Sequence, residues 1–270
     1  MKIIFTKSKW EMWNDPLIHF INRVAEDKFD GTELYFDSVK DDPKVIKDLH
    51  ESNGLFLIGQ ILTDGKTISD HIESFKRQAE FALEAGSKLV NVHAGRDYFS
   101  FDENLLLIDK INKFSKQCGV EFLIETHRAR LTYSLIDTTN YLEASSGLKL
   151  TADFSHWMVV HESDLSNQSE NLQKAIDRSF HIHARVGYEE GPQVTNPSAP
   201  EWKSHLDNHL SIWQRIIDKR KTEGKEFITI TPEFGPPNYM HTLPFSNEPI
   251  SDAWETNIKM REILNSRLEI

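Results

Sequence analysis

The chain has a single cysteine, Cys118, in its 270 residues, so no internal disulfide can form. No metal-binding spacing accompanies this residue, and we expect it to be a structural thiol. No apolar run approaches the ~18 residues that a membrane-spanning helix needs. The N-terminal segment 1–7 also lacks the long apolar region of a secretory signal. These absences predict a cytoplasmic protein with no membrane partner.

Positive charge is also in short supply. The chain has 31 Lys and Arg against 42 Asp and Glu, which gives a net charge of −11. An acidic surface repels phosphate backbones, so we expect no nucleic-acid partner. The nucleotide-binding patterns GxGxxG after the first strand and GxxxxGK[ST] are both missing. No low-complexity tract or Gly/Ser linker divides the chain, which predicts one domain over residues 1–270.

Strand-like and helix-like segments alternate along the whole chain, as they do in proteins with parallel strands and helical crossovers. The strand-like segments are 3–6, 33–36, 55–62, 89–93, 122–127, 149–156, 180–186 and 227–233. Helical patterns cover 16–28, 43–52, 68–85, 103–117, 135–144, 170–177, 202–222 and 252–268, and long loops are expected at 159–170 and 187–200. Eight such pairs predict an α/β protein of the (β/α)8 TIM barrel class, with an open doubly wound sheet as the alternative.

Four of the expected strands end on a side chain that can bind a metal. These residues are Glu125, Asp153, His183 and Glu233. The carboxyl ends of barrel strands meet at one face, and an ionised carboxylate is costly to bury there without a partner. Three carboxylates and one imidazole suit Mn²⁺, Mg²⁺ or Co²⁺, with Zn²⁺ also possible. We therefore predict that these four residues bind one divalent metal ion.

The order of these residues resembles the xylose isomerase-like TIM barrel superfamily of sugar and sugar-phosphate isomerases and epimerases, which also includes endonuclease IV. Its members place Glu, Asp, His and Glu on strands five to eight, where this chain has Glu125, Asp153, His183 and Glu233. His156 matches a histidine that often lies three residues beyond the aspartate. The resemblance covers essentially the whole chain. It implies that Glu125 and Glu233 bind the metal and also form the catalytic acid/base pair.

The function implied by this resemblance is metal-dependent isomerisation or epimerisation of a sugar or sugar derivative, through proton transfer and a metal-stabilised enediolate. Whether the sugar is phosphorylated stays open, as does a possible homo-oligomer. Three alternatives remain: a metal-dependent lyase acting on 3-keto-glycosides, an endonuclease IV-like nuclease for abasic sites, and a non-catalytic sugar-binding barrel. The nuclease is disfavoured because no Asp-x-His pair follows His183.

Six further side chains are expected to contact the substrate, namely His156, Arg185, His181, His93, Trp13 and His127. Each also has a structural interpretation. His181 lies one pleat from His183 and is the alternative metal ligand, while Arg185 is equally suited to a salt bridge with a barrel carboxylate. Trp13 is suited to stack on a sugar ring or to cap the core. Glu33, on the second strand, is expected to be a buried salt-bridge partner.

Overall fold

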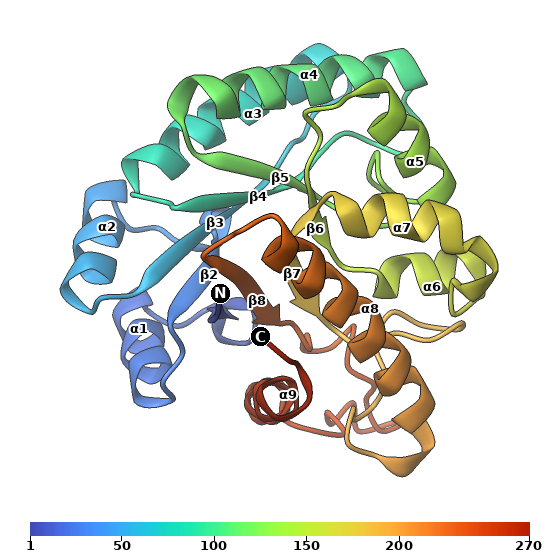
Figure 1. Ribbon diagram of the computed structural model, residues 1–270. Coiled ribbons are helices and arrows are strands. Elements are labelled where there is room, and N and C mark those ends of the chain that lie inside the picture. Colours follow the sequence, from blue (N-terminus) through green and yellow to red (C-terminus); the bar gives the residue numbers. More distant parts are fainter.

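The computed structural model describes all 270 residues and contains a closed barrel of eight parallel strands, which pair in sequence order from β1 to β8 (Figure 1). The strands are β1 (Lys2–Ser8), β2 (Gly31–Tyr35), β3 (Phe56–Leu62), β4 (Leu89–His93), β5 (Glu121–Glu125), β6 (Leu150–Ala152), β7 (Ser179–Ala184) and β8 (Phe227–Pro232). Pairing of β1 with β8 closes the ring. The predicted TIM barrel class is thus confirmed.

Helices surround the barrel on its outside (Figure 1). They are α1 (Leu17–Glu26), α2 (Pro43–Ser52), α3 (Ile68–Glu84), α4 (Phe101–Cys118), α5 (Leu135–Ala144), α6 (Ser155–His161), α7 (Ser169–Asp177), α8 (Lys203–Thr222) and α9 (Ala253–Arg267). Short 3-10 helices lie at Trp10–Met12, Phe36–Ser38, Ser166–Gln168 and Pro200–Trp202. None of the helices combines the length and the apolar composition that crossing a bilayer requires.

One predicted strand was wrong in its second half. The segment 149–156 was expected to be extended throughout, but β6 ends at Ala152 and α6 begins at Ser155. The reason is local: the Asp153 carboxylate accepts a hydrogen bond from the Ser155 backbone N–H at 3.2 Å, which starts a helical turn. Alternation of side chains therefore stops at Asp153, and His156 lies on a helix.

The main core lies between the barrel and its helices, where 55 buried apolar residues form one cluster. Inside the barrel the apolar filling is limited to a small cluster of Ile58, Leu89 and Leu123, against which Phe56 and Phe180 pack. Truncating such a leucine to alanine typically costs about 2–5 kcal/mol. Further along the same strands the inward side chains become polar, so the interior of the barrel carries an apolar floor beneath polar layers.

Candidate active site

The four predicted metal ligands converge at the carboxyl end of the barrel. Glu125 is the last residue of β5, His183 lies in β7, and Asp153 and Glu233 directly follow β6 and β8. All four are buried. One ligand atom from each lies within 4.8 Å of the others, which is the spacing of donors that share one ion. The end of a strand in a parallel barrel brings each side chain to this place.

Two of these donor atoms have no hydrogen-bond partner. The Nδ1 atom of His183 lies 3.0 Å from Oε2 of Glu233 and 3.6 Å from Oε2 of Glu125. Even so, neither His183 Nδ1 nor Glu233 Oε2 makes a hydrogen bond of acceptable geometry. Leaving buried polar atoms unpaired costs free energy, commonly about 1–3 kcal/mol each. The unpaired donors, together with the oxygen-rich ligand set, fit a divalent cation.

The charges within this group oppose one another. Burial disfavours ionisation of Glu125, but the nearby His93 and His183 outweigh it and hold the pKa of the carboxyl well below its usual value. Burial also opposes protonation of His183, yet the charges of Glu233, Glu33 and Glu125 raise the pKa of the imidazole well above its usual value. The imidazolium thus offsets part of the carboxylate charge when no metal is bound.

Asp153 is the most constrained of the three carboxylates. Its Oδ2 atom pairs with the Arg185 guanidinium, and its Oδ1 atom accepts a hydrogen bond from the Ser155 hydroxyl. Burial raises the pKa of Asp153 to about 6; Arg185 opposes this rise, while Glu233 and Glu125 add to it. Repulsion among the carboxylates therefore persists despite the arginine, and a bound cation would relieve it.

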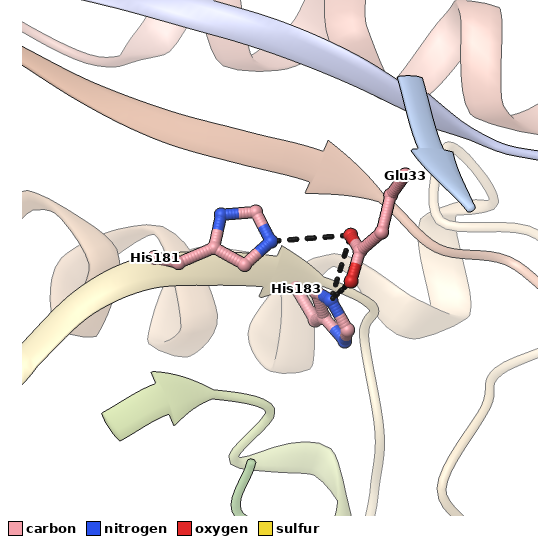
Figure 2. Close-up of side chains that lie close together, drawn as sticks. All are labelled: Glu33, His181 and His183. Carbon is pink, nitrogen blue, oxygen red and sulfur yellow. Dashed lines mark hydrogen bonds and ion pairs between the residues drawn. The ribbon is translucent and has the colours of Figure 1, made fainter. Parts of the chain in front are cut away.

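A second polar layer lies directly beneath these residues and centres on Glu33 of β2. Figure 2 shows the imidazoles of His181 and His183 directed from β7 toward its carboxylate. His183 Nε2 lies 3.0 Å from both Glu33 oxygens, and His181 Nε2 lies 3.2 Å from Oε2. The Thr231 hydroxyl and the Asn91 amide add donors at 2.7 and 3.1 Å. Glu33 is a buried ion-pair partner of both histidines, and its hydrogen-bonding capacity is filled.

The contact between Glu33 and His183 sets the orientation of the imidazole. Burial raises the pKa of Glu33, but His183 and His181 reverse the effect and keep it well below its usual value, so the carboxylate is ionised. Because Nε2 donates to this anion, Nδ1 is directed toward the three upper carboxylates. Histidines that bind metals commonly donate their other ring N–H to a carboxylate in this way.

His181, the alternative ligand, is fully engaged elsewhere. Its Nδ1 atom contacts the hydroxyl of Thr229 at 2.7 Å and the carbonyl oxygen at 3.0 Å, and its Nε2 atom faces Glu33. It is completely buried and does not line the cavity above. His183, rather than His181, therefore joins Glu125, Asp153 and Glu233.

A cavity of about 260 Å³ opens above Glu125 and Glu233. Of the six side chains expected to contact the substrate, four line it: Trp13, His93, His127 and Arg185. Trp13 is 44% exposed and faces Tyr35 with ring centroids 5.6 Å apart, so an apolar wall remains accessible. His93 Nε2 lies 2.7 Å from Glu125 Oε2 and 2.8 Å from the Gln60 amide nitrogen.

His156 occupies a different position from the one expected. It is completely buried and does not line the cavity. Its Nε2 atom lies 2.8 Å from Nη2 of Arg185, and its ring lies 4.0 Å from that of His127. We therefore interpret His156 and His181 as residues that support neighbouring side chains, in place of the direct substrate contact that was predicted for them. Both roles predicted for Arg185 agree with its position, since it forms a salt bridge with Asp153 and also lines the cavity.

Several lining residues were not identified from the sequence, namely Lys9, Tyr35, Gln60 and Tyr239. Gln60 and Tyr35 lie on strands, and their inward direction follows from alternation once the barrel register is known. Tyr239 lies in an irregular loop, where no periodic pattern predicts direction. The Arg185 guanidinium lies 4.5 Å from the Tyr239 ring centroid, so this loop helps to hold the arginine.

Comparison with known proteins agrees with the geometry of the fold. A structure of 3-keto-D-glucoside 4-epimerase from E. coli aligns over 98% of this chain and 100% of its own, with 15% identity and a TM-score of 0.67. A structure of D-allulose 3-epimerase from Methylomonas sp. aligns over 98% of this chain and 97% of its own, with 11% identity and a TM-score of 0.67. A probable 3-DHS dehydratase from Bacillus anthracis covers 99% and 100%, with 16% identity and a TM-score of 0.64.

At these identities the structural likeness establishes the fold. Among curated protein sequences no match was found. The family model described as xylose isomerase-like TIM barrel matches residues 21–222, which include three of the four converging residues, Glu125, Asp153 and His183. This match spans most of the barrel, and the chain belongs to the xylose isomerase-like TIM barrel family.

Proposed function

We propose that this protein is a divalent-metal-dependent enzyme that isomerises or epimerises a sugar or sugar derivative. The observation that carries the proposal is the convergence of three carboxylates and His183 at the floor of a cavity. Two donor atoms of this group, one on His183 and one on Glu233, are buried and unpaired. Neighbours in fold include two sugar epimerases by their names. An apolar wall at Trp13 and Tyr35 adds a surface suited to a sugar ring.

The metal would be held by Glu125, Asp153, His183 and Glu233. When bound, a divalent cation polarises a substrate carbonyl and lowers the free energy of the enediolate. Mn²⁺, Mg²⁺ and Co²⁺ suit the ligand set best, and Zn²⁺ is compatible with it. Glu33 would contribute indirectly, by holding His183 with Nδ1 directed at the ion.

Glu125 and Glu233 are the proposed acid and base because both line the cavity. Glu125 is ionised, as a base must be, and its contacts with Asn91 and His93 fix it in one orientation. Oε2 of Glu233 is free of hydrogen bonds. Two carboxylates on opposite sides of a substrate would exchange a proton between its faces, as epimerisation requires, whereas one acting alone would transfer it on one face.

The test is exchange of the substrate α-proton with solvent. Ketoses, their phosphates and 3-keto-glycosides would be incubated with the protein and Mn²⁺ in D₂O and followed by NMR. We expect deuterium incorporation for the true substrate, and Glu233→Gln should reduce its rate by about 10²–10⁴-fold, the usual contribution of a general acid or base. Glu189→Gln is the matched control, because Glu189 contacts His205 outside the cavity.

Three results would contradict the proposal. Exchange at the wild-type rate in Glu233→Gln would remove Glu233 from catalysis. Protein that binds no divalent metal, measured by elemental analysis after dialysis against Mn²⁺, would favour a non-catalytic sugar-binding barrel. Three bound zinc ions per chain would instead favour the nuclease.

A lyase is the second candidate, since the probable dehydratase shares this fold over the full chain. Elimination would begin with the same removal of an α-proton but would end with loss of a β-substituent. The NMR experiment separates the two reactions, because an isomerase or epimerase conserves the substrate's formula and a lyase releases a second product.

A further inference from the structure

Three cationic side chains lie on the walls of the cavity above the carboxylates. Lys9, Arg130 and Arg185 line it, against the two carboxylates Glu125 and Glu233. Arg185 is accounted for by its ion pair with Asp153. Lys9 and Arg130 have no carboxylate within ion-pair distance, and they contact only main-chain carbonyl oxygens.

Arg130 is unusual among the buried arginines. Three arginines are at most 7% exposed: Arg130, Arg185 and Arg220. Arg185 pairs with Asp153, and Arg220 lies 3.2 Å from Glu223. Taking a charge out of water costs several kcal/mol unless a counter-ion compensates. Only Arg130 lacks such a partner: the charges of Glu125 and Asp64 act on it without an ion pair, and Asp64 pairs with Arg96 at 3.0 Å.

The hydrogen bonds of Arg130 leave one edge of its guanidinium free. Nη1 donates to the carbonyl oxygens of Thr63 and Gly95 at 3.2 and 3.5 Å. The Nε and Nη2 atoms make no hydrogen bond within the protein. Burial lowers the pKa of Arg130 to about 10, which still leaves it protonated at neutral pH. The main-chain contacts therefore fix a charged group whose two-donor edge remains available to a ligand in the cavity.

Lys9 adds positive charge to the same cavity. It is 3% exposed, and its Nζ atom donates to the carbonyl oxygens of Met12 and Trp13 at 2.7 and 2.9 Å. These bonds anchor the ammonium group next to the Trp13 wall. Two buried cations that make no ion pair line one cavity, which favours a ligand that brings negative charge of its own.

We propose that the cavity binds a sugar acid, whose carboxylate is received by the Nε–Nη2 edge of Arg130. The planar edge with two parallel N–H groups matches two oxygens of a carboxylate or of a phosphate, and the place of Arg130 in the barrel favours the carboxylate. Phosphate sites in TIM barrels are frequently built from the loops after strands seven and eight, whereas Arg130 lies on the loop after β5. That the ligand is a sugar derivative rests on the proposed function, whereas the anion subsite is inferred from the position of Arg130 alone.

Binding of matched neutral and anionic probes tests the assignment. Dissociation constants would be measured by calorimetry with Mn²⁺ for three pairs: D-fructose and D-fructuronate, D-glucose and D-glucuronate, and D-galactose and D-galacturonate. We expect at least one uronate to bind at least ~10-fold more tightly than its neutral partner, as a charge-assisted bidentate contact implies. D-fructose 6-phosphate and D-glucose 6-phosphate should not bind more tightly than the corresponding uronates.

Three variants assign the preference to one residue. Arg130→Gln should abolish the uronate preference, and Arg130→Lys should reduce it, because lysine keeps the charge but loses the planar edge. Arg128→Gln is the matched control, since Arg128 lies on the same loop but does not line the cavity. Thermal unfolding would be followed for each variant, and Arg130→Lys decides the outcome if Arg130→Gln does not fold.

The proposal is overturned if no uronate is preferred to its neutral partner, including the case in which none binds. A stronger preference for the sugar phosphates overturns the assignment to a carboxylate, and a preference that survives in both Arg130 variants overturns the role of Arg130. Failure of the proposed function has a different signature. If no deuterium is exchanged but uronates are still preferred, the proposed function fails and the anion subsite is retained. If only neutral sugars exchange deuterium, the proposed function is retained and the anion subsite fails.

Discussion

Two polar layers lie one above the other inside the barrel, and they differ in how completely their atoms are paired. The lower layer is Glu33 with the groups around it, where His181 uses both ring nitrogens, Glu33 accepts from four side chains, and only the amide oxygen of Asn91 is unpaired. The upper layer is Glu125, Asp153, His183 and Glu233, where His183 Nδ1 and Glu233 Oε2 are unpaired. Burial is almost the same in both, so burial alone does not mark a binding site.

The difference indicates what each layer does. A buried charge surrounded by donors is already compensated, and binding a ligand there would require hydrogen bonds to be broken first. A buried layer with unpaired donors and several like charges carries a free-energy cost that a bound cation offsets. We therefore interpret the lower layer as the support and the upper layer as the place where the metal binds.

The sharpest test of this comparison exchanges one histidine at a time. His181 and His183 lie on the same strand and the same face, and both are completely buried. His183→Gln should weaken Mn²⁺ binding by more than ~100-fold, beyond the loss usual for a supporting residue. His181→Gln should leave Mn²⁺ bound but should cost about 1–3 kcal/mol of unfolding free energy, because Glu33 and Thr229 lose a partner.

Competition with a fluorescent chelator gives the Mn²⁺ affinities, and urea unfolding gives the stabilities. The interpretation of the layers would be reversed if His181→Gln lost Mn²⁺ while His183→Gln retained it. Equal losses in both variants would mean that the two layers act as one unit.

The second test acts on the link between the layers. Glu33→Gln removes the anion that receives His183 Nε2, so the imidazole is no longer held with Nδ1 toward the upper carboxylates. We expect Mn²⁺ affinity to fall by about 10–100-fold, the range typical for outer partners of a ligating histidine. The measurement is the same chelator competition.

A matched control for this variant is Glu11→Gln. Glu11 is also a largely buried carboxylate with an ion-pair partner, Lys7, but it contacts none of the four upper residues. It should lower stability and leave Mn²⁺ affinity unchanged. Unchanged affinity in Glu33→Gln as well would show that Glu33 does not orient His183.

The sequence predicts the upper layer better than the lower one. Strand endings are visible as a carboxylate or imidazole after an apolar run, and the closed barrel then brings Glu125, Asp153, His183 and Glu233 together. The limits are local: α6 begins two residues after Asp153, so His156 lies on this helix and not on a strand. Neither the pairing of Glu33 with two histidines nor the free edge of Arg130 has a sequence pattern, because both depend on contacts across the barrel.

A buried histidine outside both layers gives a reference for how burial alone affects the dependence of stability on pH. Its substitution has the smallest expected effect of the three tests. His209 of α8 is completely buried and faces no carboxylate; its Nε2 atom accepts the Gly187 N–H at 3.0 Å. Burial lowers the pKa of His209 to about 3, with the charges of His205 and Arg185 contributing in the same direction. The unfolded chain, in which histidine titrates near pH 6.5, therefore binds a proton first.

It follows that the contribution of His209 to stability is complete above about pH 6.5 and is lost as the pH falls toward 3. Between pH 6.5 and 5.5 the loss from this residue should be about 1.0 kcal/mol, because the unfolded histidine is already half protonated at pH 6.5. His209→Gln keeps an acceptor for Gly187 and does not titrate, so its unfolding free energy should fall less steeply than that of the wild type over this range. Urea unfolding at the two pH values would measure the fall for each protein. An equal fall in wild type and variant would mean that His209 is already protonated in the folded protein, like His183, and that burial without a carboxylate partner does not distinguish it from the paired histidines.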